Sequence, residues 1–181
     1  MQLEKMKPQE FDGIYAMMEQ AFPTDEYRPY DAQKRLLDNP AYQIYTARQP
    51  GQDAAAAFLA VWDFTEYVFL EHFAVREALR SLGLGSRILQ EFLRLSARQA
   101  CLEAELPETE LARRRISFYE RNGFYASPYP YVQPPMAEGK KEVPLVIMTS
   151  KEAVSRERFE EIKARLYREV YRVRGFDEIW M

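Results

Sequence analysis

Apolar and polar positions change their period several times along the chain, and each change marks a predicted element. Apolar residues recur at helical spacing in five segments, at residues 8–22, 31–39, 83–98, 107–122 and 151–174. Shorter apolar or alternating runs predict seven strands, at residues 2–6, 42–48, 54–64, 65–75, 100–106, 124–135 and 143–150. This interleaving of helices and strands predicts a mixed α/β fold.

Proline and glycine set several of the predicted boundaries. Pro107 stands where a helix can begin, because the first helical position needs no N–H donor. Gly123 follows the last polar turn of the same helix and suits a left-handed C-terminal cap. No internal repeat or linker interrupts the pattern. We therefore expect one domain over residues 1–150, with a helical extension at 151–181 that packs on it.

Composition narrows the class of protein. The 181 residues, 47% of them hydrophobic, suffice for one domain with a substantial core. The chain has 25 basic and 28 acidic residues, and its net charge of −3 disfavours a sequence-independent nucleic-acid binder. Cys101 is the one cysteine, so neither a disulfide framework nor a zinc site is expected. No apolar run of about 18 residues exists, which predicts no membrane span and a cytoplasmic protein.

Two glycines stand where a predicted strand gives way to a predicted helix, in "FLEHFAVREALRSLGLGSRIL". Glycine allows left-handed dihedrals and a close approach of a ligand to the backbone. A helix N-terminus offers N–H groups and a positive dipole end to an anion. Gly83 and Gly85 therefore either form a plain strand-to-helix turn or bind a phosphate group. Neither the P-loop pattern nor a third glycine at Ile88, as a dinucleotide fingerprint would need, is present.

The segment "FLEHFAV…RSLGLGSRIL", followed about thirty residues later by "ISFYERNGF", resembles the GNAT superfamily of acetyl-CoA-dependent N-acetyltransferases. The resemblance is strongest over residues 55–126. It implies a central, twisted and mostly antiparallel sheet of about six to seven strands flanked by helices, with a C-terminal amphipathic helix. It also implies acetyl-CoA as co-substrate and no metal.

The resemblance assigns coenzyme contacts to two adjacent segments. The strand before the glycines would pair its backbone with the pantetheine arm, through Phe73, Ala74 and Val75. The loop would surround the pyrophosphate, through Arg80, Ser81, Leu82, Gly83, Leu84, Gly85 and Ser86. Many family members also place an asparagine before the tyrosine-bearing helix. The stretch "LPETELARRRISFYE" has none, so that contact does not carry over.

Three residues are candidates for the chemistry of acyl transfer. Tyr119 matches the family tyrosine that lies near the coenzyme sulfur and serves as general acid, although such an aromatic residue also suits a core. The base could be Glu71 or Glu103, carboxylates in apolar strands where burial would raise the pKa. Each could instead form a structural ion pair, and an ordered water could serve as the base. His72, on the opposite face from Glu71, favours a hydrogen-bonded core position.

The acceptor side is predicted from two aromatic segments. Glu26 and Arg28 lie in the connector "FPTDEYRPY", and Tyr129 and Tyr131 lie in "SPYPYVQPP". These residues could bind a small amine or a peptide end, or the second segment could be an aromatic edge strand protected by prolines. We expect a monomer or homodimer that acetylates a primary amine of a small molecule or peptide. A non-catalytic acyl-CoA-binding regulatory module is the alternative.

Overall fold

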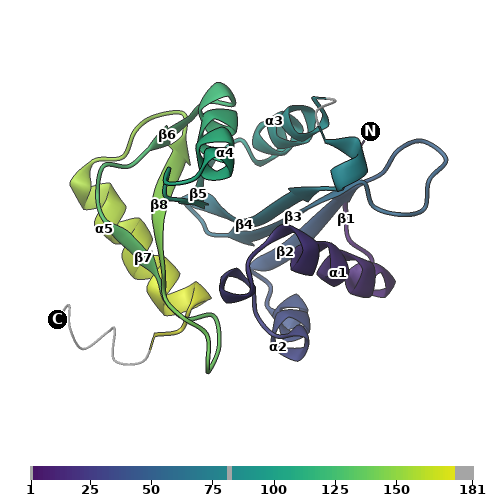
Figure 1. Ribbon diagram of the computed structural model, residues 1–181, viewed down its shortest axis with the longest axis horizontal. Helices are drawn as coiled ribbons and strands as arrows, with labels where there is room; N and C mark the ends of the chain where they lie inside the picture. The colour runs from purple at the N-terminus through teal and green to yellow at the C-terminus, as the bar shows by residue number, and fades with distance from the viewer. Residues whose placement is uncertain (1, 81–82, 174–181) are drawn as a thin grey trace. The chain divides into compact units, whose positions relative to one another are not determined.

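The structure, a computed structural model, describes residues 2–80 and 83–173 of the chain. The chain forms two compact units, Met1–Leu102 and Glu103–Met181. Each unit has its own strands and helices, drawn in the purple-to-teal and green-to-yellow parts of Figure 1.

The first unit contains a sheet in the order β1-β2-β3-β4-β5. The strands are β1 (Leu3–Lys5), β2 (Tyr42–Ala47), β3 (Ala57–Asp63), β4 (Tyr67–Val75) and β5 (Gln99–Glu105), and the last three residues of β5 begin the second unit. Neighbours from β1 to β4 are antiparallel, whereas β5 runs parallel to β4. The parallel connection passes through a helix, as a crossover between parallel strands requires.

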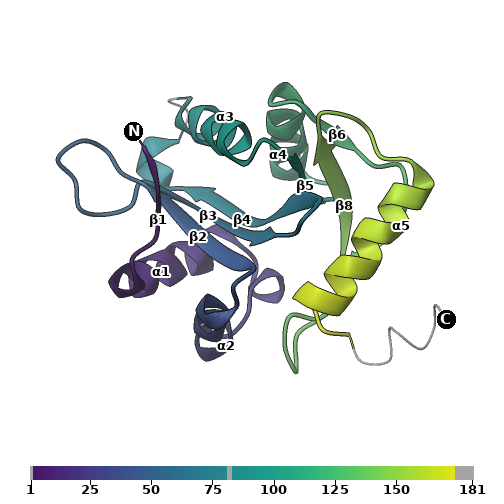
Figure 2. The same cartoon turned by 180° about the vertical axis from the view of Figure 1, so that it is seen from behind.

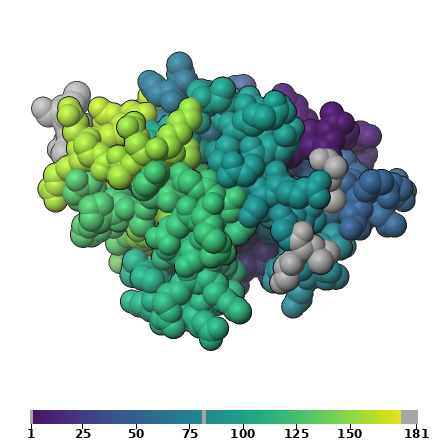
Figure 3. Space-filling model, turned by 90° about the horizontal axis from the view of Figure 1, so that it is seen from above, coloured from purple at the N-terminus to yellow at the C-terminus, as the bar shows by residue number. Residues whose placement is uncertain are grey.

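Helices cover both faces of this sheet. α1 (Phe11–Ala21) and α2 (Tyr30–Arg35) lie on one face and α3 (Leu84–Ser96) lies on the other, as Figures 1 and 2 show. Strand β3 is accordingly buried at every position except its last, Asp63. Figure 3 looks onto the side that α3 covers, where the exposed face of the helix forms the surface.

The second unit pairs two short strands with successive parts of a longer one. β6 (Phe124–Ala126) and β7 (Tyr131–Gln133) are both antiparallel to β8 (Val143–Ser150). α4 (Glu110–Arg121) precedes β6, and α5 (Arg156–Arg165) continues into a wider π-helical turn at Leu166–Val170. The ring of Phe159 on α5 lies 6.5 Å from that of Tyr131, so α5 packs against β7.

The mixed α/β class, with mostly antiparallel strands flanked by helices, is confirmed. The described residues contain eight strands because the predicted strand at 124–135 was wrong as a single element. "SPYP" separates it into β6 and β7, and only those two short segments pair with β8. Gly123 has the left-handed conformation expected of it, with φ of +85°.

Two predicted helix starts were also wrong. α4 begins at Glu110, after Thr109, whose hydroxyl accepts a hydrogen bond from the N–H of Ala112 at 3.0 Å. α5 begins at Arg156, and the Ser155 hydroxyl accepts from the N–H of Arg158 at 3.1 Å. In both cases a side chain that caps the helix decides the start.

Candidate active site

The glycine segment forms a sharp turn at the N-terminus of α3. Gly83 is the N-cap residue, with φ of +69° and ψ of +4°, a left-handed conformation that glycine adopts without strain. A Cβ added there would meet nothing within 4 Å, so backbone conformation rather than crowding requires the glycine. Ser81 and Leu82, two of the predicted pyrophosphate contacts, lie outside the described residues.

The start of α3 is suited to an anion. Glycine at the N-cap has no side chain to cap the first N–H groups, and the first turn of this helix contains no acidic residue. The positive end of the helix dipole is therefore not neutralised by its own first turn. The Nε–H of Arg80 donates to the carbonyl of Val75 at 3.1 Å and so joins the end of β4 to the start of the loop.

Strand β4 is paired with β3 to its end but with β5 only over its first part. Leu59, Phe58 and Ala57 pair with Phe73, Ala74 and Val75. On the other edge, the described pairing with β5 runs from Tyr67 to Leu70, opposite Gln99–Leu102. A β-bulge falls between these regions, since Ala60 pairs with His72 and Val61 with Leu70, which leaves Glu71 as the extra residue.

The bulge places Glu71 in a buried ion pair. Its Oε1 accepts a hydrogen bond from Arg28 Nη1 at 2.7 Å, and its Oε2 accepts from the indole Nε1–H of Trp62 at 3.1 Å. The side chains of Arg28 and Glu71 are 7% and 1% exposed. Burial raises the pKa of Glu71, but the charge of Arg28 and the two hydrogen bonds outweigh burial, and the net pKa is lowered.

His72, next to Glu71 in sequence, contacts the connector "FPTDEYRPY" that contains Glu26 and Arg28. Its Nε2 lies 2.8 Å from the backbone carbonyl of Glu26, and its ring lies 4.8 Å from that of Phe22. Burial lowers the pKa of His72, so the imidazole is neutral at neutral pH. Two predicted acceptor residues, Glu26 and Arg28, are thus held against β4. Glu71 and His72 both contact this connector, where plain alternation predicts opposite faces, because the bulge interrupts the alternation.

In the second unit, the other candidate base is held by two tyrosines. The Tyr131 hydroxyl donates to Glu103 Oε1, and the Tyr171 hydroxyl donates to Oε2 at 2.5 Å. Burial, followed by the charge of Glu103, raises the pKa of Tyr131 well above 10, so this phenol keeps its proton. Tyr171 was not among the predicted site residues. Its spacing from Tyr167 showed only that both lie on one side of a helix.

Tyr119 lies in the last part of α4. Its ring lies 5.2 Å from that of Phe118 and 5.7 Å from that of Phe124. Burial raises the pKa of Tyr119 to about 12, against a small opposing effect of Arg115. The phenol is therefore protonated at neutral pH and can donate a proton.

Tyr129, the remaining predicted acceptor residue, packs on the C-terminal helix. Its ring lies 5.2 Å from that of Phe159, and the guanidinium of Arg156 lies 5.3 Å from the ring centre. The aromatic face of Tyr129 therefore already contacts a cation of this chain.

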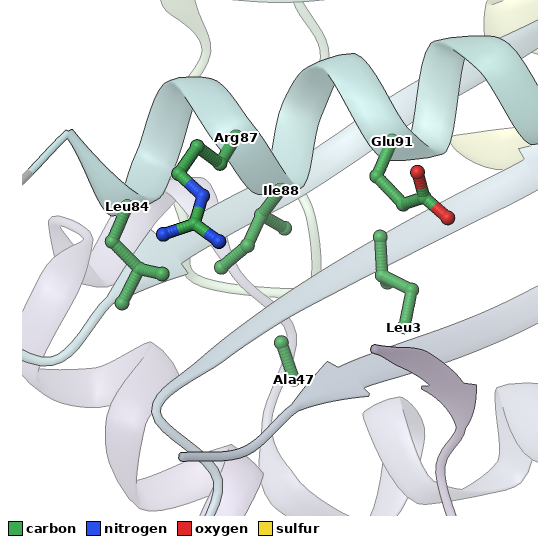
Figure 4. A pocket seen from close by; sticks show the side chains of 6 residues that line it. All are labelled: Leu3, Ala47, Leu84, Arg87, Ile88 and Glu91. Atoms are coloured by element: carbon green, nitrogen blue, oxygen red, sulfur yellow. The ribbon is translucent and has the colours of Figure 1, made fainter. Parts of the chain in front are cut away.

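A cavity of about 140 Å³ lies beside the glycine turn, between α3 and strands β1 and β2. Figure 4 shows its lining by Leu3, Ala47, Leu84, Arg87, Ile88 and Glu91. Leu84 is the one predicted site residue in this lining. Within residues 2–80 and 83–173, no group of three histidine, cysteine or acidic side chains could hold a metal ion, and no helix is long and apolar enough to cross a membrane.

The fold and the turn together define an α/β protein in which a glycine turn at a helix N-terminus, with geometry suited to an anion, follows a bulged strand. Residues 40–126 match the family model described as the acetyltransferase (GNAT) domain. A GNAT-family structure from Bacteroides thetaiotaomicron is 30% identical, with a TM-score of 0.85 over 96% of this chain and 100% of that chain. The chain therefore belongs to the GNAT family of acetyltransferases.

More distant structures share the fold. A variant of spermidine N-acetyltransferase from Vibrio cholerae is 10% identical, with a TM-score of 0.63 over 83% of this chain and 94% of that chain. The ribosomal-protein-S18-alanine N-acetyltransferase from Escherichia coli is 18% identical, with a TM-score of 0.58 over 86% of this chain and 96% of that chain. A Bacillus subtilis acetyltransferase in complex with CoA is 16% identical, with a TM-score of 0.58 over 82% of this chain and 97% of that chain. No curated protein is significantly similar in sequence.

Proposed function

We propose that this protein is an N-acetyltransferase that transfers the acetyl group of acetyl-CoA to a primary amine of a small molecule or peptide. The observation that carries the proposal is the left-handed Gly83 at the uncapped start of α3, directly after β4. It lies within the segment that matches the GNAT domain model. Related folds include proteins named for acetylating spermidine and a ribosomal-protein alanine.

The proposal assigns the coenzyme to the end of β4 and the start of α3. Backbone groups of Phe73, Ala74 and Val75 lie beyond the described pairing with β5 and would bind the pantetheine arm. The first-turn N–H groups of Leu84, Gly85 and Ser86 would bind the pyrophosphate, together with the loop from Arg80. These residues fit an anionic ligand because the turn is open and the first turn of the helix contains no acidic residue.

The chemistry is a direct attack on the thioester. The amine nitrogen bonds to the acetyl carbon, the carbon–sulfur bond breaks, the amine loses a proton to a base, and the thiolate gains a proton from an acid. We assign the acid to Tyr119, whose pKa of about 12 keeps it protonated at neutral pH.

We assign the base to Glu103 rather than Glu71. The Glu71 side chain is 1% exposed, and Arg28 and Trp62 bind its two oxygens, so a substrate amine has no access to it. Glu103 is only partly buried, and the hydroxyls of Tyr131 and Tyr171 donate to its two oxygens.

For the acceptor, Glu26 and Tyr129 remain proposed contacts, although Tyr129 already packs on Arg156. The single, buried Cys101 is compatible with a reducing compartment, so we propose that the protein acts in the cytoplasm. We also propose that it acts as a monomer or homodimer.

The test is calorimetry with acetyl-CoA joined to an assay of thiol release. The amine panel should include spermidine and a peptide with an N-terminal alanine. Acetyl-CoA binding and amine-dependent thiol release would support the proposal. Binding without turnover on any amine would instead favour a non-catalytic acyl-CoA-binding module, and absence of binding would refute both functions.

A further inference from the structure

The carboxylate of Glu103 has both oxygens bound by phenols that come from distant parts of the second unit. Tyr131 belongs to β7, and Tyr171 follows the π-helical turn at the end of α5, 68 residues from Glu103 in sequence. One donor on each oxygen fixes the plane of the carboxylate as well as its position. Tyr131 is 3% exposed, so this hydroxyl has little access to water as an alternative partner.

The backbone of the C-terminal helix departs from α-helical geometry immediately before Tyr171. The N–H of Tyr171 donates to the carbonyl of Leu166, five residues earlier, at 3.0 Å. A wide turn of this kind rotates the following residues relative to a regular α-helix, and such turns occur often at functional sites. Here the turn directly precedes the phenol that binds Glu103.

Tyr167, four residues earlier, has a different partner. Its hydroxyl donates to the backbone carbonyl of Val132 at 2.5 Å, and its ring lies 5.9 Å from that of Tyr131 and 6.5 Å from that of Tyr171. Tyr167 thus joins the helix to the backbone of β7. The hydroxyl of Tyr167 binds the backbone of β7, whereas the hydroxyl of Tyr171 binds Glu103.

We infer that Tyr131 and Tyr171 are positioning residues, which hold the Glu103 carboxylate ionised and oriented to accept the proton of the amine. This inference rests on the proposed function, because it takes Glu103 as the base. A hydrogen bond donated to a carboxylate stabilises its charged form. The C-terminal helix therefore contributes to the reaction as well as to the packing of its unit.

The direct experiment is a pH titration of the glutamate side-chain carboxyls by ¹³C NMR, with Glu103→Gln used to assign the Glu103 signal. Tyr171→Phe should move the titration of that signal to higher pH by about one unit, the equivalent of a tenfold loss of preference for the ionised form. The acid limb of the kcat/KM profile should move by the same amount. Tyr167→Phe is the matched control and should move neither.

Several results would overturn the inference. An unshifted Glu103 signal in folded Tyr171→Phe would remove the positioning role, and so would an equal shift in Tyr167→Phe. A shifted signal with an unmoved acid limb would show that Glu103 is not the base. If Tyr171→Phe does not fold, Tyr131→Phe should give the same two shifts. Wild-type protein without acetyl transfer to any amine would refute the proposed function, whereas the NMR titration still tests the effect of the two phenols on the carboxylate.

Discussion

Replacing Arg28 with methionine should strongly destabilise the first unit, because it leaves a buried carboxylate without its cation. Arg28 and Glu71 are separated by 2.7 Å, and their side chains are 7% and 1% exposed, so water cannot replace the lost partner. Breaking one side of such a pair costs about 3–5 kcal/mol. For a chain of this size, that loss corresponds to a fall in Tm of roughly 6–20 °C.

The destabilisation should depend on pH in a defined direction. In the wild type, the lowered pKa of Glu71 contributes stability that is present above its ordinary value of 4.5 and is lost as the pH falls. In Arg28→Met the cation is lost, and burial, the largest effect, should raise the pKa of Glu71 in the folded state against the remaining hydrogen bond from Trp62. The variant is then less stable than wild type at neutral pH, and it regains stability at lower pH as the carboxylate takes up a proton. The difference in stability should therefore be largest near pH 7 and shrink toward pH 4.

Urea denaturation of wild type and variants between pH 4 and pH 7 measures this effect. Arg28→Met/Glu71→Gln should recover most of the loss, because the neutral amide needs no cation and still accepts the hydrogen bond from Trp62. Arg94→Met provides the surface control, since Arg94 is mostly exposed and Glu91 is partly exposed, so their pair should contribute nothing measurable. A loss below about 1 kcal/mol in Arg28→Met, or a loss that does not change with pH, would refute the reasoning.

Three further predictions concern the turn, the acid and a helix cap. Gly83→Glu should abolish acetyl-CoA binding measured by calorimetry, because the carboxylate repels phosphate; Gly139→Glu has a similar left-handed φ of +80° and open space, and should bind normally. Both should lose about 1–2 kcal/mol of stability from backbone strain. Tyr119→Phe should lower kcat roughly a hundredfold with an unchanged coenzyme Kd, and an unaltered rate would exclude Tyr119 as the acid. Thr109→Ala should lower the stability of the protein by about 1 kcal/mol in thermal melts, because the Ala112 N–H loses its acceptor.

Local sequence signals predicted most elements and the turn at the start of α3. The periodicity of residues 83–98 predicted α3, and Gly83 has the left-handed conformation that motivated its selection. The same signals misplaced the start of α4, since Pro107 is tolerated at a first helical turn whereas the Thr109 hydroxyl caps the helix. Short strands were also merged, because three-residue elements such as β6 and β7 are too short to show their own period.

The sequence by itself therefore determined the family resemblance, the α/β class and the position of the glycine turn, all of which depend on neighbouring residues. Only the tertiary structure decided what each candidate carboxylate contacts. Glu71 meets an arginine 43 residues away, at a bulge that alternation did not predict. Glu103 meets Tyr171 across 68 residues, after a π-helical turn. Periodicity indicates which face a side chain occupies, but its partner depends on how distant segments pack, and that partner decides how readily the carboxylate accepts a proton.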